Sequence, residues 1–257
     1  MRIAGALFVG LLLMAAGCKT DQAARQTENM GNPEPPAVAA LDPAMAGSIS
    51  GTITFQGKPP ERLRIDLNAD PGCQGGPEND AEQYVVGKKG ALANVYVYIK
   101  KGLPPNVKFP AKTAVVVVDQ KHCRFVPHVV AVQVGEPVEF RNSDPTMHNV
   151  HTMPNVTGNM GSDISEAPMG QPQRETFSQP EQMLRVLCNN HPWMSAFVNV
   201  SATPFFAVTG ANGRFTIEGL PPGVYTLAAV HEKMGEQTMQ VTVSTQINSR
   251  ADFSFTQ

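Results

Sequence analysis

The chain has 257 residues, a formal net charge of −2, and 42% hydrophobic against 16% charged residues. This length and composition predict one or two globular domains with a hydrophobic core, and they do not fit a transmembrane protein. Acidic and basic residues are scattered along the chain, which excludes the basic surface that nucleic acids or anionic membranes require.

The start of the chain has the pattern of an export signal: a basic residue, an apolar run and three small residues, at Arg2, 3–14 and 15–17. The small residues end at Cys18, and this resembles the lipobox of bacterial lipoproteins. The resemblance implies that residues 1–17 are removed and that acyl chains on Cys18 hold the protein at a membrane. Lys19 favours the outer over the inner membrane. The alternative is an ordinary signal peptide cut near Gly17.

A flexible linker is predicted next, over residues 18–45. It is rich in Ala, Gln, Asn, Glu and Pro and has no apolar period with which to build a core. Apolar and polar residues then alternate over 47–57 and again over 92–99. This alternation predicts two β-strands of a sandwich.

Three cysteines remain if Cys18 is lipidated, in a compartment where an unpaired thiol needs a reason to stay reduced. Cys73 lies in a turn-rich stretch and Cys123 follows a strand-like run, and neither has a metal-ligand partner at a recognised spacing. We therefore expect a Cys73–Cys123 disulfide. The alternatives for the cysteine that is left, Cys188, are a buried inert thiol or a bridge to Cys123.

Two histidines end the segment 130–151, in which two alternating strands flank a turn at 135–137. In an extended chain, His148 and His151 project to opposite faces because they are three residues apart. A single metal ion on the core side can bind one of them and not both. The spacing leaves open which one binds.

A second cluster of metal donors follows in the sequence Cys188-Asn-Asn-His191-Pro-Trp-Met194. Strands are predicted on both sides of it, over 183–187 and 195–200, and the thiol of Cys188 is expected to point inward. A thiolate, an imidazole and a thioether are the soft and borderline donors that copper prefers. Zinc fits less well because structural zinc sites seldom use methionine.

The pattern Val-x-x-Gly-x-x-Val-x-Phe-x-Asn-x-Asp, followed by His148-Asn-Val and by Cys-x-x-His-x-x-Met, resembles the cupredoxins, or blue copper proteins. The resemblance covers about residues 113–202, and the short ligand loop is similar to that of amicyanin. It implies one type 1 copper ion held by His148, Cys188 and His191, with Met194 as the long axial ligand. Asn149 is then expected to tie the two ligand loops together by hydrogen bonds.

Such a site favours electron transfer over catalysis, because these ligands suit both Cu(I) and Cu(II). The His-Cys-His bridge of multicopper enzymes is missing, since Leu187 and Asn189 flank the cysteine, and there is no Gly-x-Ser-x-Gly motif or phosphate-binding loop. We therefore expect no enzymatic activity. By the resemblance, electrons enter and leave at the exposed edge of His191, beside the apolar residues Pro192 and Trp193.

The remaining histidines are assigned structural roles. His122 and His128 are expected to make hydrogen bonds that support the fold, and His151 is expected to lie on the surface or beside a ligand. His231-Glu232 lacks the second histidine of a zinc protease motif, because Gly235 stands at that spacing.

The C-terminal run Gly-x-Phe-x-Ile-x-Gly-Leu-Pro-Pro-Gly-x-Tyr, over 213–225, resembles the carboxypeptidase regulatory-like, transthyretin-type β-sandwich. Asn212-Gly213 is predicted to form a hairpin turn. The predicted fold is all-β, a cupredoxin Greek-key sandwich or barrel packed with a second, smaller sandwich. Residues 46–111 are expected to form N-terminal strands that are shared with the C-terminal sandwich. The copper domain is expected over 112–203 and the regulatory-like sandwich over 204–257.

The predicted function is that of a monomeric copper electron carrier of the bacterial periplasm or cell surface, with redox proteins as partners. The alternatives are a copper protein for delivery or sensing without electron transfer, and a surface module with a carbohydrate-binding-like fold.

Overall fold

The computed structural model describes residues 42–73, 80–105, 109 and 114–257. The predicted signal peptide, Cys18 and residues 18–41 of the predicted linker lie outside the described residues. Within the described residues the fold is all-β, as expected, and the helices are short 3-10 turns at Pro43–Met45, Pro71–Cys73 and Lys88–Gly90. No helix in this part of the chain has the length and apolar character needed to cross a membrane.

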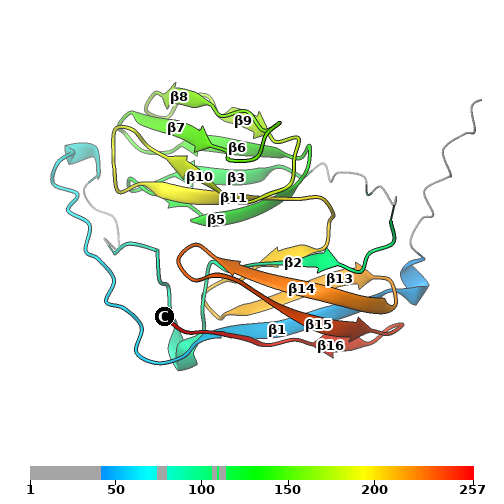
Figure 1. The fold of residues 1–257 in the computed structure, drawn as a ribbon. Helices are drawn as coiled ribbons and strands as arrows, with labels where there is room; N and C mark the ends of the chain where they lie inside the picture. Colours follow the sequence, from blue (N-terminus) through cyan, green and yellow to red (C-terminus); the bar gives the residue numbers. More distant parts are fainter. Residues whose placement is uncertain (1–41, 74–79, 106–108, 110–113) are drawn as a thin grey trace, which may run out of the picture. The chain divides into compact units, whose positions relative to one another are not determined.

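A first sandwich is formed by the strands between Val116 and Ser201 (Figure 1). One of its sheets has the order β5-β11-β10-β7-β8 and the other β4-β3-β6-β9. The pairs β5–β11 and β3–β6 are parallel, and strands that are not consecutive in the chain are neighbours in both sheets, so the chain crosses between the sheets. The strands are Val116–Gln120 (β3), Phe125–Val126 (β4), Val129–Gln133 (β5), Pro137–Asn142 (β6), His148–Met153 (β7), Asp163–Glu166 (β8), Gln173–Thr176 (β9), Glu181–Leu187 (β10) and Ser195–Ser201 (β11).

A second sandwich combines strands from both ends of the described chain. One sheet has the order β13-β1-β16, with β17 also paired to β1, and the other has the order β12-β2-β14-β15. N-terminal strands thus pair with C-terminal ones. The strands are Gly47–Phe55 (β1), Tyr96–Lys101 (β2), Phe206–Val208 (β12), Arg214–Leu220 (β13), Gly223–His231 (β14), Gly235–Val243 (β15), Asn248–Arg250 (β16) and Phe253–Phe255 (β17).

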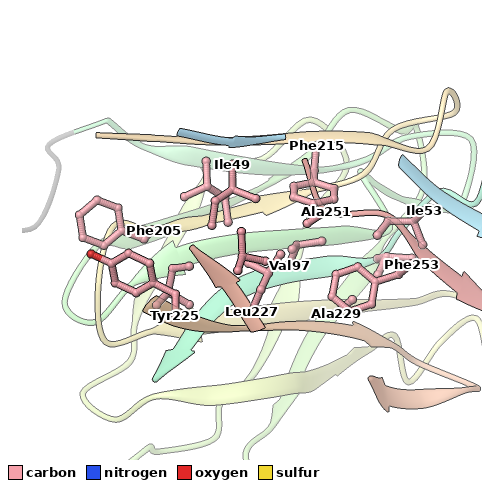
Figure 2. Packing of buried hydrophobic residues seen from close by; sticks show 14 of the residues in the cluster. Ile49, Ile53, Val97, Phe205, Phe215, Tyr225, Leu227, Ala229, Ala251 and Phe253 are labelled. Atoms are coloured by element: carbon pink, nitrogen blue, oxygen red, sulfur yellow. The ribbon is translucent and has the colours of Figure 1, made fainter. Parts of the chain in front are cut away.

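Each sandwich has its own hydrophobic core. Figure 2 shows the core of the second sandwich, where Ile49 and Phe215 from one sheet face Val97 and Leu227 from the other. The core of the first sandwich includes Val118, Phe140, Val150 and Val198, and it extends to Cys188 and Met194 at one end. The predicted metal donors therefore adjoin a closed apolar core.

The strands that carry the site follow the expected alternation. Leu184 and Val186 of β10 are fully buried, and Cys188 continues on the same side of the chain. Ala196, Val198 and Val200 of β11 are buried as well. The predicted turn between β5 and β6 contains Gly135 at φ +81°, a conformation that glycine adopts without steric cost.

Two local expectations need correction. The strand expected over 92–99 is present as β2, but it begins only at Tyr96, because Asn94 adopts φ +62° and interrupts the extended chain. Asn212-Gly213 does not close a hairpin, since β12 pairs with β2 whereas β13 pairs with β1. Gly213 instead allows a close approach, because a Cβ atom there would lie 2.5 Å from the carbonyl oxygen of Ile53.

Candidate metal centre

Two segments of the first sandwich bring the predicted donors to one end of its core. His148 is the first residue of β7, and Cys188, His191 and Met194 lie in the connection between β10 and β11. This connection curls back on itself, because the backbone N–H of Cys188 donates to the carbonyl of Met194 at 3.2 Å. The N–H of Met194 donates to the carbonyl of His191 at 2.9 Å. The loop can therefore present several side chains to one point.

Three of the predicted ligands converge on that point. The Nδ1 atoms of His148 and His191 are 3.0 Å apart, and Sγ of Cys188 lies 3.6 Å from Nδ1 of His191. All three residues are buried, and His148 is 0% exposed. Met194 is 1% exposed and belongs to the same core cluster as Cys188.

These separations fit a single metal ion. Bonds of about 2.0 Å to nitrogen and about 2.3 Å to sulfur, at roughly tetrahedral angles, place two nitrogens about 3.3 Å apart and nitrogen and sulfur about 3.5 Å apart. The observed 3.0 and 3.6 Å lie close to these values. One thiolate, two imidazoles and a nearby thioether form the donor set that suits copper.

Carboxylates hold the outer nitrogen of each imidazole. Nε2 of His148 lies 2.8 Å from Oδ2 of Asp144, and Nε2 of His191 lies 2.9 Å from Oδ2 of Asp70. When each Nε2 carries a proton that it donates to a carboxylate, each Nδ1 faces the common point. Such outer partners fix the orientation of metal-binding imidazoles and raise their basicity.

The charges at the centre follow from these contacts. Burial disfavours the imidazolium form of His148, but hydrogen bonds with Asp144 and Cys188 outweigh burial and raise its pKa to about 9. Burial also opposes the thiolate form of Cys188, but hydrogen bonds with His148 and His191 lower its pKa to about 7. In the metal-free protein these shifts favour an imidazolium at His148 and a thiolate at Cys188, and the thiolate is the form that binds a metal ion.

The two residues expected beside the ligands lie as follows. Oδ1 of Asn149 accepts a hydrogen bond from the backbone N–H of Asn189 at 3.2 Å, which links β7 to the residue after Cys188. His151 points away from the cluster, and its Nδ1 lies 3.0 Å from Oδ1 of Asn189. The structure therefore brings His148 to Cys188 and leaves His151 on the opposite face of β7.

The three described cysteines have the arrangement that we expected from the sequence. Cys73 and Cys123 form a disulfide, whereas Cys188 is free and buried. The disulfide lies against the metal centre, because its sulfur atoms and a ring nitrogen of His191 lie within 4.8 Å of one another. It also connects the segment that carries Asp70 to the first sandwich.

The surface expected for electron exchange is altered by that segment. Pro192 is exposed, and Trp193 is half-buried and donates from Nε1 to the carbonyl of Cys123 at 3.1 Å. His191, expected to be exposed at its edge, is only 3% exposed. This expectation was wrong, because Asp70 bonds to the outer nitrogen that the resemblance had left open to solvent.

The side chains of the other described histidines apart from His151 do not belong to this cluster of donors. Nδ1 of His128 lies 2.9 Å from the carbonyl oxygen of Ser195, and its Nε2 lies 2.6 Å from Oε1 of Glu232. Burial lowers the pKa of His231 to about 4, so this imidazole stays neutral near pH 7. The backbone N–H of His122 donates to Oδ1 of Asp144 at 2.7 Å.

Sequence reasoning missed Asp70 and Asp144. Asp144 stands four residues before His148 within the quoted Asn-x-Asp pattern, so its position carried a signal that was not used. Asp70 is separated from His191 by 121 positions and lies in a Pro-Gly turn, which indicates a loop but no chemistry. Only the folded chain brings it to the site.

A family model agrees with the C-terminal resemblance seen in the sequence. Residues 188–256 match the family model of the carboxypeptidase regulatory-like domain, a range that begins at Cys188. Among solved structures, a Cu(I) amicyanin variant is 24% identical with a TM-score of 0.31, over 40% of this chain and 100% of that chain. A reduced amicyanin variant is 26% identical with a TM-score of 0.31, over 34% of this chain and 82% of that chain.

A copper-containing nitrite reductase from Thermus scotoductus SA-01 is also similar to part of the chain. It is 24% identical with a TM-score of 0.31, and the match covers 39% of this chain. The chain spans only 25% of the length of that enzyme chain. No curated protein matches the sequence.

Proposed function

We propose that the protein is an electron carrier with one type 1 copper ion, held by His148, Cys188 and His191 with Met194 as the axial ligand. The observation that carries the proposal is the convergence of two imidazole Nδ1 atoms and one free thiol at a buried point. The outer nitrogen of each imidazole is held by a carboxylate. Buried polar groups are normally hydrogen-bonded, and here both bonded imidazoles also turn their other nitrogen toward one free thiol.

Electron transfer is favoured over catalysis because the site is enclosed. Catalytic metal sites keep a coordination position open to substrate, whereas His148, Cys188, His191 and Met194 are each at most 3% exposed. A bound copper ion supplies a one-electron couple between Cu(I) and Cu(II). The chain keeps the donors in place through Asp144, Asp70 and the hydrogen bonds of the loop, so little rearrangement is needed when the charge changes.

We also propose that the protein is exported and held at the outer membrane by a lipid on Cys18, and that it works as a monomer with redox proteins. The Cys73–Cys123 disulfide supports an oxidising compartment, where such bonds persist. Labelling cells with a radioactive fatty acid tests the anchor: wild-type protein should be labelled, and Cys18→Ala should not. Equal labelling of the two would contradict it.

The copper proposal is tested by loading the full chain with Cu(II) and recording its visible absorption and electron paramagnetic resonance. One equivalent of copper should give an intense thiolate-to-Cu(II) band that disappears on one-electron reduction and returns on oxidation. Cys188→Ser should abolish the band, whereas His151→Ala, a matched control on the other face of β7, should leave it nearly unchanged.

The alternatives predict other outcomes. Stoichiometric copper without an intense visible band would favour a protein that delivers or senses copper. No stoichiometric copper at all would favour a binding module that has kept the fold alone. Either result would contradict an electron carrier.

A further inference from the structure

The turn that precedes the disulfide covers the metal centre. Asp70 lies directly before the helical turn Pro71–Cys73, and Cys73 is bonded to Cys123 of the first sandwich. Oδ2 of Asp70 lies 2.9 Å from Nε2 of His191. The segment Asp70–Cys73, called the strap below, therefore reaches the ligand from a distant part of the sequence.

Several contacts hold the carboxylate of Asp70 in one position. Oδ2 also accepts a hydrogen bond from Oγ1 of Thr146 at 2.8 Å, and Oδ1 accepts one from the backbone N–H of Gly72 at 2.7 Å. The backbone N–H of Cys73 donates to the carbonyl oxygen of Asp70 at 3.0 Å. Both carboxylate oxygens are thus occupied, and the turn itself is closed.

The strap is also packed closely against the loop that leads to β7. A Cβ atom added at Gly72 would lie 2.7 Å from Cβ of Thr146, nearer than side chains approach one another. Thr146 lies two residues before His148. The strap is therefore fixed to both sides of the centre, through Thr146 next to one ligand and through His191 itself.

We propose that Asp70 is a positioning residue of the metal centre, which holds Nδ1 of His191 toward the ion, closes the solvent edge of this ligand and stabilises the oxidised metal. The inference rests on the proposed copper function. A carboxylate that accepts the Nε2 proton makes the imidazole a stronger donor, and its negative charge favours the ion of higher charge. The strap thus sets the reduction potential of the centre.

The experiment compares reduction potentials of copper-loaded full chains by redox titration followed at the visible band. Asp70→Asn keeps the shape of the side chain and removes its charge. It should raise the affinity for Cu(I) relative to Cu(II) about tenfold. This corresponds to a rise in the reduction potential of about 59 mV for a one-electron couple. Asp66→Asn is the control, because Asp66 is an exposed acid nearby whose Oδ1 accepts from the backbone N–H of Asn68. The reduction potential of the copper-loaded Asp66→Asn variant should equal that of the wild type.

A second measurement needs no copper. In the metal-free protein, proton exchange of Nε2–H of His191 with water, followed by nitrogen-15 NMR, should be slow in the wild type and fast in Asp70→Ala. Equal exchange in both proteins, or an unchanged potential in Asp70→Asn alongside a normal blue band, would overturn this inference alone. Failure of the wild type to form a blue copper centre would overturn the inference together with the proposed function.

Discussion

The two sandwiches of this protein bury different kinds of residues. The second sandwich has an apolar core, and Thr209 and His231 are the buried polar residues that its described strands and loops contribute. The first sandwich buries many more, among them Gln120, Asp144, His148, Glu166 and His191. A buried polar group is costly unless it is paired, so the first sandwich needs hydrogen-bond partners for many more buried side chains than the second.

The difference shows where chemistry is located. In the first sandwich two buried imidazoles are paired with carboxylates, His148 with Asp144 and His191 with Asp70, and the two rings converge on one point. In the second, Nε2 of the buried His231 has no hydrogen-bond partner, and burial keeps its pKa at about 4. Its Nδ1 accepts a hydrogen bond from the backbone N–H of Lys233 at 3.2 Å, and among the described residues no cluster of metal donors includes it.

The largest expected effect concerns the disulfide of the first sandwich. Replacing Cys73 and Cys123 together by serine opens a loop with a sequence separation of 50, and it should lower the free energy of unfolding by about 4 kcal/mol. Urea unfolding followed by the fluorescence of Trp193, the single tryptophan, measures this in the first sandwich. A loss below about 1 kcal/mol would contradict a stabilising role of this crosslink.

A somewhat smaller effect is expected in the core of the second sandwich. Leu227 is 0% exposed, and Leu227→Ala should destabilise the protein by about 3 kcal/mol through lost burial and the cavity that remains. Circular dichroism during urea unfolding checks the stability. The visible band of the copper-loaded variant should be unchanged, and a shifted band would contradict the separation of core and site.

The smallest effect is a change in the titration of Cys188 in the metal-free protein. Hydrogen bonds with His148 and His191 lower its pKa from 9.0 to about 7 despite burial, so the thiolate should form at lower pH than in an ordinary cysteine. His148→Gln should raise the pKa of Cys188, because the imidazolium is lost and burial remains. Ultraviolet thiolate absorbance measures it, with His151→Gln as control. If the pKa of Cys188 were the same in His148→Gln as in the wild type, this would contradict the hydrogen bond between Cys188 and His148.

Much of the first sandwich could be predicted from the sequence, and so could the position of three candidate metal donors in one loop. Alternation in β10 and β11 placed Leu184, Val186 and Cys188 on one face, because side chains alternate regularly along a strand. The loop Cys188–Met194 is short enough for its donors to reach one ion. The spacing of His148 and His151 excluded a shared ion but did not choose between them, and only the resemblance and the fold did.

What the sequence could not show depends on contacts between distant segments. Asp70 reaches His191 only because the disulfide and Thr146 hold the strap in place. Asn212-Gly213 predicts a tight turn, but the same residue types occur both in hairpins and in turns that lead from one sheet to another. The sequence could not distinguish the two. Local patterns report conformation, whereas pairing partners are decided by the whole fold.

X-ray absorption at the copper edge tests most directly whether His148, Cys188 and His191 hold one ion. In the wild type we expect one sulfur neighbour at about 2.3 Å and two imidazole nitrogens at about 2.0 Å. In Cys188→Ser, the short sulfur neighbour should disappear. A wild-type spectrum with only nitrogen and oxygen neighbours would show that Cys188 does not bind the ion.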